Sequence, residues 1–185
     1  MEEFRFELTD EEKGYLRETV VRSIASGLRL PDAPVRPDEP PTDRLKSELG
    51  AFVTLKLGGR LRGCIGLIQG SGPLFRTVWN MAQRAAFQDP RFPPLTGGEF
   101  GQVEYEISIL GPIEPCPDPE RVEIGRHGLI MMRDGRSGLL LPQVPLEWNW
   151  DRETFLAQTC AKAGLERGCW RDPATTILWF EAVVF

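Results

Sequence analysis

A pair of glycines between two strand-like segments constrains the fold of this chain more than any other feature. Gly58 and Gly59 separate "GAFVTLKL" from "RLRGCIGLI", and both segments carry the aliphatic residues typical of strands. Two consecutive glycines suit the positive φ angles of a two-residue hairpin turn. A turn of this length also predicts the cross-strand register, in which the pairs are Leu57 with Arg60, Leu55 with Arg62, and Val53 with Cys64.

Three helices are expected, over about residues 9–27, 73–89 and 151–164. The first has a Thr-x-x-Glu capping box at Thr9 and Glu12. The second must end near Asp89, because Pro90 disfavours a helical conformation in the residue before it. Between the first helix and the glycine hairpin, residues 31–46 hold five prolines and no apolar period, which predicts an ordered meander or an exposed linker.

The other strands are also expected to pair as antiparallel neighbours. Residues 102–110 alternate strictly, with Glu104, Glu106 and Ser108 on a polar face. A second hairpin is predicted around Asp134-Gly135, and residues 175–185 form an apolar closing strand. The predicted class is α+β, with a mainly antiparallel sheet and about three helices.

Composition excludes several classes of protein. The chain has 185 residues and a net charge of −5, which argues against a surface built to bind nucleic acid. No apolar run approaches the length of a membrane span, and the acidic start lacks the features of a signal peptide. A cytoplasmic location is expected. The four cysteines form no CxxC pair and there is one histidine, so no metal site and four free thiols are predicted.

The segment "LRGCIG" places a thiol among residues that are poor strand formers. On an extended strand Arg62 and Cys64 share a face, so the guanidinium would lower the pKa of the thiol while apolar neighbours would raise it. Cys64 is therefore either a nucleophile or a buried small hydrophobe. Gly63 marks a bulge or a close approach by a ligand or another backbone, and a bulge there would turn Cys64 away from Arg62. Arg62 either binds a ligand or forms an ion pair with Glu104 or Glu106.

A second polar segment, "FQDPRF", presents Asp89, Arg91 and Phe92 at the end of the second helix. The proline stiffens the backbone between the two charges, which suits either a binding site or a structural ion pair. Glu106 and Ser108 could supply acceptors to the arginines, or they could lie on a solvated strand face.

His127 and Gln143 complete the candidate residues. His127 has the only side chain in the chain whose ordinary pKa lies near neutrality, and the alternatives are a proton-transfer group or a hydrogen-bonded structural residue. Gln143 follows a predicted strand end, where loop residues often line binding sites.

Taken in order, six segments resemble the AMMECR domain family, the family of the AMME-syndrome candidate gene product, whose bacterial and archaeal members are called AmmeMemoRadiSam system protein A. The segments are "GAFVTLKLGGRLRGCIG", "AFQDPRF", "VEYEISIL", "GRHGLIM", "LLLPQV" and "WDRETFLAQTCAKAGL". The resemblance runs from about Thr9 to Phe185, nearly the whole chain, and it indicates a single domain over 1–185.

The resemblance implies a larger lobe around an antiparallel sheet and a smaller lobe, placed within residues 70–130, with a cleft between them. It assigns no reaction and does not identify a cofactor. The name of the prokaryotic members implies a Memo-like protein and a radical S-adenosylmethionine protein as partners. Matched motif by motif, the implied site residues are Arg62, Gly63, Cys64, Asp89, Arg91, Phe92, Glu106, Ser108, His127 and Gln143.

Two hypotheses of function follow. In the first, the chain is an enzyme or an enzymatic component of that system, with Cys64 as nucleophile or redox group, Arg62 and Arg91 as anion anchors, and Glu106 or His127 as proton-transfer groups. In the second, the chain is a non-catalytic scaffold that binds partner proteins, and "LRGCIG" serves the fold.

Overall fold

The computed structural model describes residues 7–185, so the first six residues of the acidic start lie outside the described residues. The chain divides into two compact units. The first unit holds residues 7–110 together with the chain end, 183–185, and the second unit holds residues 111–182. The second unit overlaps the range predicted for the smaller lobe only over residues 111–130.

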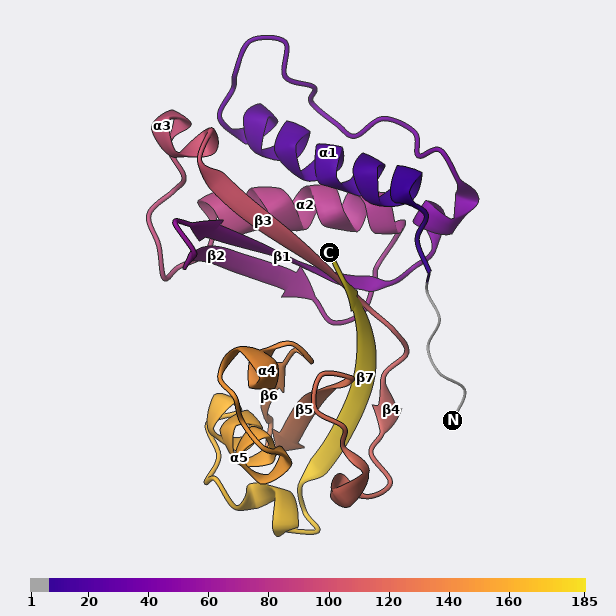
Figure 1. The fold of residues 1–185 in the computed structure, drawn as a ribbon, viewed down its shortest axis with the longest axis vertical. Coiled ribbons are helices and arrows are strands. Elements are labelled where there is room, and N and C mark those ends of the chain that lie inside the picture. The colour runs from indigo at the N-terminus through magenta and orange to yellow at the C-terminus, as the bar shows by residue number, and fades with distance from the viewer. Residues whose placement is uncertain (1–6) are drawn as a thin grey trace. The chain divides into compact units, whose positions relative to one another are not determined.

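The first unit packs two helices on one face of an antiparallel sheet (Figure 1). Its elements are α1 (Asp10–Gly27), the 3-10 turn η1 (Asp43–Lys46), β1 (Gly50–Leu57), β2 (Arg60–Leu67), α2 (Leu74–Phe87), α3 (Gly97–Phe100) and β3 (Val103–Leu110). The strand order is β2-β1-β3, and the chain end runs beside β3, where Phe185 and Ile107 exchange two backbone hydrogen bonds. Helix α2 packs on β1 and β2, and α1 packs on α2.

The predicted capping box begins α1. The backbone N–H of Glu12 donates to the Thr9 hydroxyl at 3.2 Å, and the Glu12 carboxylate accepts from the Thr9 N–H at 2.8 Å. These bonds satisfy two of the N–H groups that a helix start leaves without a partner. The apolar face of the helix then enters the core.

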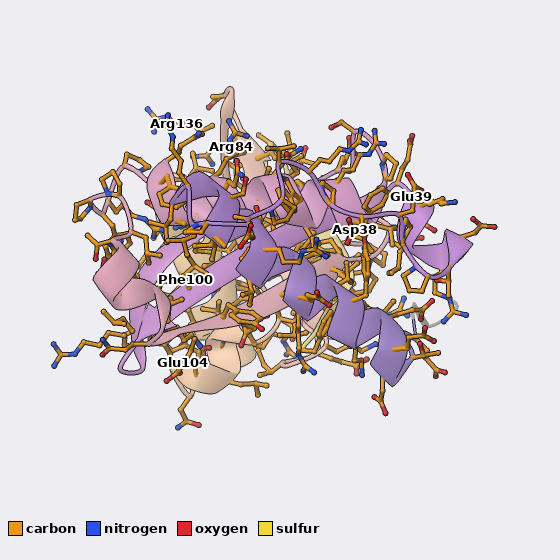
Figure 2. The ribbon with its side chains drawn as sticks, turned by 90° about the horizontal axis from the view of Figure 1, so that it is seen from above. Asp38, Glu39, Arg84, Phe100, Glu104 and Arg136 are labelled. Atoms are coloured by element: carbon orange, nitrogen blue, oxygen red, sulfur yellow. A yellow bond between two sulfur atoms is a disulfide. The ribbon has the colours of Figure 1, made fainter. Side chains whose placement is uncertain are left out.

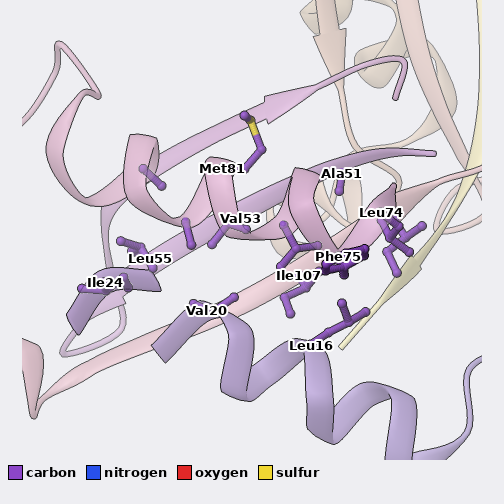
Figure 3. Packing of buried hydrophobic residues seen from close by; sticks show 14 of the residues in the cluster. Leu16, Val20, Ile24, Ala51, Val53, Leu55, Leu74, Phe75, Met81 and Ile107 are labelled. Carbon is purple, nitrogen blue, oxygen red and sulfur yellow. The ribbon is translucent and has the colours of Figure 1, made fainter. Parts of the chain in front are cut away.

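The core of this unit is built mainly from α1, β1, α2 and β3 (Figure 3). Its labelled members are Leu16, Val20 and Ile24 of α1, Ala51, Val53 and Leu55 of β1, Leu74, Phe75 and Met81 of α2, and Ile107 of β3. All are at most 3% exposed. Because alternate residues of β1 and β3 enter the core, the residues between them lie on the opposite face of the sheet.

The proline-rich segment is an ordered meander packed along α1, not a free linker. The Tyr15 hydroxyl donates to the Asp38 carbonyl at 2.6 Å, and Arg22 pairs with the Asp38 carboxylate. Figure 2 shows Asp38 and Glu39 at the side of the α1 ribbon.

The second unit packs one long helix on a smaller antiparallel sheet. Its elements are β4 (Glu114–Pro115), the 3-10 turn η2 (Pro119–Arg121), β5 (His127–Arg133), β6 (Arg136–Leu140), α4 (Val144–Glu147), α5 (Arg152–Lys162), the 3-10 turn η3 (Cys169–Arg171) and most of β7 (Thr176–Val184). Strand β5 pairs with both β6 and β7, and β4 pairs with β7. The predicted turn is confirmed at Asp134 (φ 51°) and Gly135 (φ 74°).

The predicted α+β class with a mainly antiparallel sheet is confirmed. All strand pairs whose register is resolved within residues 7–185 are antiparallel. The three expected helices are α1, α2 and α5, and the described residues add two helices of four residues each, α3 and α4. Four-residue helices are too short to produce an apolar period, so the pattern could not predict them.

The prediction of four free thiols is wrong. Cys160, at the end of α5, and Cys169, in η3, form a disulfide with a Cα–Cα distance of 6.0 Å. Both residues are buried in the core of the second unit. The prediction rested on an assumed reducing compartment and on scattered spacing, but helix α5 and the returning loop bring the two residues within bonding distance. Cys64 and Cys116 form no disulfide.

Candidate functional site

A β-bulge in the glycine hairpin decides where the thiol of Cys64 lies. The turn has positive φ at Gly58 and Gly59 as predicted, and Leu57 pairs with Arg60. The next pair, Lys56 with Leu61, still follows this register, but the predicted pairs of Leu55 with Arg62 and Val53 with Cys64 are wrong, because Leu55 pairs with Gly63 and Val53 with Ile65. Arg62 is thus the extra residue of a bulge, in which two residues of one strand oppose one residue of the other.

The bulge places Cys64 opposite Thr54 instead of Val53. On its other side Thr54 pairs with Glu106 of β3, so Cys64, Thr54 and Glu106 form a row across three strands. Paired residues of neighbouring strands project from the same face of a sheet. The row therefore lies on the face opposite the helical core, together with Lys56, whose amine is 3.9 Å from the Glu106 carboxylate.

The thiol accepts a hydrogen bond from its cross-strand neighbour. The Thr54 hydroxyl donates to Sγ of Cys64 at 3.2 Å. Thr54 is buried, whereas Cys64 is partly exposed. A hydrogen bond donated to sulfur favours the thiolate over the thiol, because the donor interacts more strongly with the charged form.

Asp89 holds the backbone at Cys64. Its carboxylate accepts the Cys64 N–H at 2.9 Å and lies just beyond the end of α2, where the side chain is 2% exposed. Hydrogen bonds from the Arg91 guanidinium keep the pKa of Asp89 well below its usual range, against the opposing effect of burial, and the Cys64 N–H lowers it further. A buried carboxylate with this many donors remains charged at neutral pH.

Arg91 joins this carboxylate to the thiol residue. Its Nε and a terminal nitrogen donate to the two oxygens of Asp89 at 3.0 and 2.7 Å, and a terminal nitrogen also lies 3.4 Å from the Cys64 carbonyl. The side chain is 49% exposed. The hydrogen bond to Asp89 raises the pKa of Arg91, and the Cys64 charge adds to this effect. A fixed, half-exposed guanidinium beside a thiol is suited to binding an anionic group.

Arg62 pairs with a residue that the sequence patterns did not indicate. Its guanidinium makes a bidentate ion pair with Glu99 at 2.8 and 3.2 Å, and the expected partners Glu104 and Glu106 are not used for it. The bulge carries Arg62 off the regular strand alternation and toward α3. Hydrogen bonds from Arg62 lower the pKa of Glu99 to about 2. Phe92 lies between the two arginines, with its ring centroid 6.0 Å from the Arg62 guanidinium and 5.5 Å from that of Arg91.

Gly63 allows α2 to approach the hairpin. A Cβ atom at this position would lie 2.1 Å from the Ala85 carbonyl oxygen, which is far closer than van der Waals contact allows. Glycine is therefore required by packing at this point of β2. Ser108, the last polar residue of the β3 face, is fully buried opposite Phe52.

The remaining candidates belong to the second unit. His127 is 2% exposed, its ring stacks on Trp179 at 4.4 Å, and its Nδ1 accepts the Glu123 N–H at 3.0 Å. Burial lowers the pKa of His127, and the nearby Arg126 lowers it further. Gln143 is the residue that precedes the short helix α4. A role for His127 in proton transfer at Cys64 stays a prediction.

The structure thus brings six of the candidates into one cluster of the first unit: Arg62, Gly63, Cys64, Asp89 and Arg91, with Phe92 against both arginines. Two residues that contact this cluster, Glu99 and Thr54, are not among the predicted site residues. Glu99 is the last residue of a Thr-x-x-Glu capping box that begins at Thr96, the same motif that predicted α1. Thr54 could have been found only from the bulge, which nothing in the pattern of β1 indicates.

Within residues 7–185 no group of three or more His, Cys, Asp or Glu side chains is arranged to hold a metal ion. No helix in this part of the chain is long and apolar enough to cross a membrane.

The fold and the cluster define a two-unit α+β protein with a partly exposed thiol on the face of an antiparallel sheet opposite its helices. The model of the AMMECR1 family matches residues 16–185, and the chain belongs to this family.

Relatives agree with this assignment over most of the chain. A protein of Thermococcus gammatolerans is 45% identical, with 80% of this chain and 78% of that protein covered. Protein TK0174 of Thermococcus kodakarensis is 40% identical, with 97% and 92% covered. The crystal structure of the uncharacterised protein PH0010 from Pyrococcus horikoshii matches with a TM-score of 0.87 at 38% identity, covering 97% of this chain and 93% of that one.

Proposed function

We propose that this protein is an enzyme, or an enzymatic component of a larger system, that acts through Cys64 on a small molecule or a modified residue. The observation that carries the proposal is the hydrogen bond from the Thr54 hydroxyl to Sγ of Cys64. A thiol that only fills space in a core needs no donor aimed at its sulfur. Cys64 is also partly exposed, which a nucleophile requires.

The surrounding residues have separate roles in this proposal. Thr54 stabilises the thiolate, and Arg91 binds an anionic group of the substrate next to it. Asp89 is a positioning residue, because it fixes both the Cys64 backbone and the Arg91 guanidinium. In the covalent step the Cys64 proton leaves to an acceptor, Sγ forms a bond to an electrophilic carbon of the substrate, and the displaced group departs with the electron pair. Glu106, one strand beyond Thr54, is the proposed proton acceptor.

Alkylation of the full chain by iodoacetamide tests the proposal. A Cys116→Ser background leaves Cys64 as the one thiol outside the disulfide, and Cys64→Ala in the same background is the blank. We expect labelling of the folded protein with a pH midpoint below the ordinary thiol value of about 8.5. Labelling that occurs only after unfolding would exclude Cys64 as a nucleophile.

A second candidate is a non-catalytic binding module, and the packing at Gly63 favours it. Two contacts give "LRGCIG" a structural purpose that needs no reaction: Gly63 packs against Ala85, and the Cys64 N–H donates a hydrogen bond to Asp89. The family resemblance suggests a Memo-like protein and a radical S-adenosylmethionine protein as partners, in the cytoplasm. Co-purification of the three chains tests this second candidate function. We expect Cys64→Ala to keep the complex. Failure of the wild-type chain to form a complex would count against a binding module.

A further inference from the structure

Strand β2 is the outer strand of the sheet in the first unit (Figure 1). Among residues 7–185 the only strand that pairs with it is β1. On the other side of β2, two loop side chains bind the backbone of Cys64. Asp89 accepts its N–H at 2.9 Å, and Arg91 donates to its carbonyl at 3.4 Å. These side chains take the place that a neighbouring strand would have at Cys64, and so protect this point of the edge.

The next backbone groups on this side of β2 belong to Gly66. In an antiparallel pair the N–H and C=O groups of every second residue point to the same side, and the register from Cys64 to Leu67 is regular. Because the groups of Cys64 point away from β1, those of Gly66 do so as well. Gly66 is partly exposed, and no strand of the described residues lies beside it there. The edge therefore offers one donor and one acceptor to a ligand.

Arg91 offers a further donor next to these groups. Its Nε and Nη2 bind Asp89, and Nη2 also contacts Cys64, whereas Nη1 has no hydrogen-bond partner in the part of the chain that the structure describes. The Arg91 side chain is 49% exposed and that of Asp89 is 2% exposed. The carboxylate that balances Arg91 is thus buried behind it, and a ligand meets the guanidinium. A carboxylate in the ligand complements this charge.

The direction of a bound peptide follows from these positions. An extended peptide that pairs antiparallel with β2 runs from Gly66 toward Cys64. It cannot continue along the edge, because Asp89 and Arg91 already occupy the outward groups of Cys64. The peptide must therefore end at Gly66, with its terminal carboxylate beside Arg91. A parallel peptide would place its N-terminal ammonium beside the guanidinium, which like charges disfavour.

We propose that the edge of β2 at Gly66 binds the C-terminal residue of an extended peptide. Its carboxylate accepts from the Gly66 N–H and from Arg91, and its own N–H donates to the Gly66 carbonyl. Strand addition and capture of a C-terminal carboxylate are both known modes of peptide recognition. The inference rests on the function proposed for Cys64 and deepens it, because it names a peptide C-terminus as the class of substrate.

The probe is acetyl-Val-Thr-Val with a free C-terminus, titrated into the full-length ¹⁵N-labelled chain while the backbone amide of Gly66 is followed by NMR. Before the titration, the Gly66 amide should exchange with solvent faster than those of Ile65 and Leu67, which point to β1. We expect its signal to shift and saturate, with a dissociation constant on the order of 1 mM. Its hydrogen exchange should become slower in the complex.

Two further peptides are matched controls that leave the protein unchanged. The same peptide with a C-terminal amide loses the charge that faces Arg91, and should bind about tenfold more weakly. The same peptide with an N-methyl group on its last residue loses the donor to the Gly66 carbonyl, and should also bind severalfold more weakly. Equal affinity of the three peptides, or Gly66 shifts that do not saturate, would overturn the proposal.

One variant and its control test the arginine. Arg91→Gln should weaken the acid peptide about tenfold and leave the affinity of the amide peptide nearly unchanged. Arg60→Gln removes an exposed arginine at the other end of β2 and should change neither affinity. The three wild-type titrations decide the matter even if Arg91→Gln does not fold.

Alkylation of Cys64 by iodoacetamide separates this inference from the proposed function. Labelling of the folded protein without a Gly66 shift would exclude the peptide site and leave the nucleophile. A saturating Gly66 shift, together with labelling only after unfolding, would support the peptide site and exclude the reaction.

Discussion

The hydroxyl of Thr54 donates a hydrogen bond to Sγ of Cys64 across β1 and β2, at 3.2 Å. The pair exists because a bulge at Arg62 shifts the strand register by one residue. Without the bulge, Val53 would oppose the thiol, and the thiol would lie among aliphatic side chains with no donor. The reactivity of Cys64 should therefore depend on a residue of the neighbouring strand.

Thr54→Val tests this dependence with a nearly isosteric change. We expect the pH midpoint of Cys64 alkylation to rise by up to about one pH unit, because a neutral hydrogen bond contributes on the order of 1 kcal/mol and this equals less than one unit. Thr54→Ser, which keeps the hydroxyl, should retain the wild-type profile. Equal profiles for valine and threonine would show that the hydroxyl does not influence the sulfur.

Asp89 should be essential to the order of this cluster. Asp89→Asn loses the ion pair with Arg91 and weakens the contact with the Cys64 N–H, so we expect a loss of about 1–3 kcal/mol in the free energy of unfolding. Urea denaturation measures the loss. Glu104→Gln is the matched control, because Glu104 is an exposed carboxylate of the same unit on β3, and it should change stability by less than about 0.5 kcal/mol. Similar losses for the two variants would contradict the role of Asp89.

Gly63→Ala should destabilise the protein by steric overlap. The added Cβ would lie 2.1 Å from the Ala85 carbonyl oxygen, a backbone atom that cannot rotate away. We expect a cost of about 1–3 kcal/mol, the usual range for overpacking, seen as a lower thermal midpoint. Gly72→Ala has no atom within 4 Å of its new Cβ and should be neutral or slightly stabilising. A Gly63→Ala variant with an unchanged thermal midpoint would mean that α2 and β2 can move apart without loss of stability.

The local elements of this fold follow from sequence, whereas the site follows mostly from tertiary placement. Some features depend only on neighbours within a few residues, so the sequence pattern predicts them correctly. These are the capping box at Thr9, the glycine turn and the alternation of β3. The bulge at Arg62 is different, because no local pattern indicates it, and it lies next to Gly63, where α2 packs closely on β2. A change of one residue in register moves each side chain to the other face of the sheet.

The same distinction explains the partners that were missed. Asp89 and Arg91 are two residues apart, so their ion pair is local and could be anticipated. The partner of Arg62 is 37 residues distant, at Glu99, and only the fold brings it near. A reducing compartment argues against the disulfide between Cys160 and Cys169, but the compartment says nothing about how close the two sulfur atoms lie in the folded chain.

Glu99 makes the stability of the first unit sensitive to acid. Hydrogen bonds from Arg62, and then from the N–H and hydroxyl of Thr96, lower its pKa from 4.5 to about 2, so the folded state binds the proton less readily than the unfolded state. The stabilisation is then complete above about pH 5 and is lost as the pH falls toward 2. The stability difference between wild type and Glu99→Gln, measured by thermal unfolding at several pH values, should shrink over that range. With Glu104→Gln as control, a difference that stays constant down to pH 2 would contradict the pairing.

The disulfide of the second unit should contribute substantially to its stability. Cys160 and Cys169 are nine residues apart, and cross-linking a loop of this size removes unfolded-state entropy equivalent to about 2–3 kcal/mol. We therefore expect a lower thermal midpoint for the Cys160→Ser, Cys169→Ser double variant, and the same decrease for wild type unfolded with a reductant. The double variant should be insensitive to reductant, because its remaining cysteines, Cys64 and Cys116, form no disulfide. If the reductant lowers the midpoint of both proteins equally, the decrease in wild type does not come from this bond. An unchanged midpoint in the double variant would show that ion pairs such as Arg133 with Glu166, at 2.6 Å, are enough to hold the loop after α5.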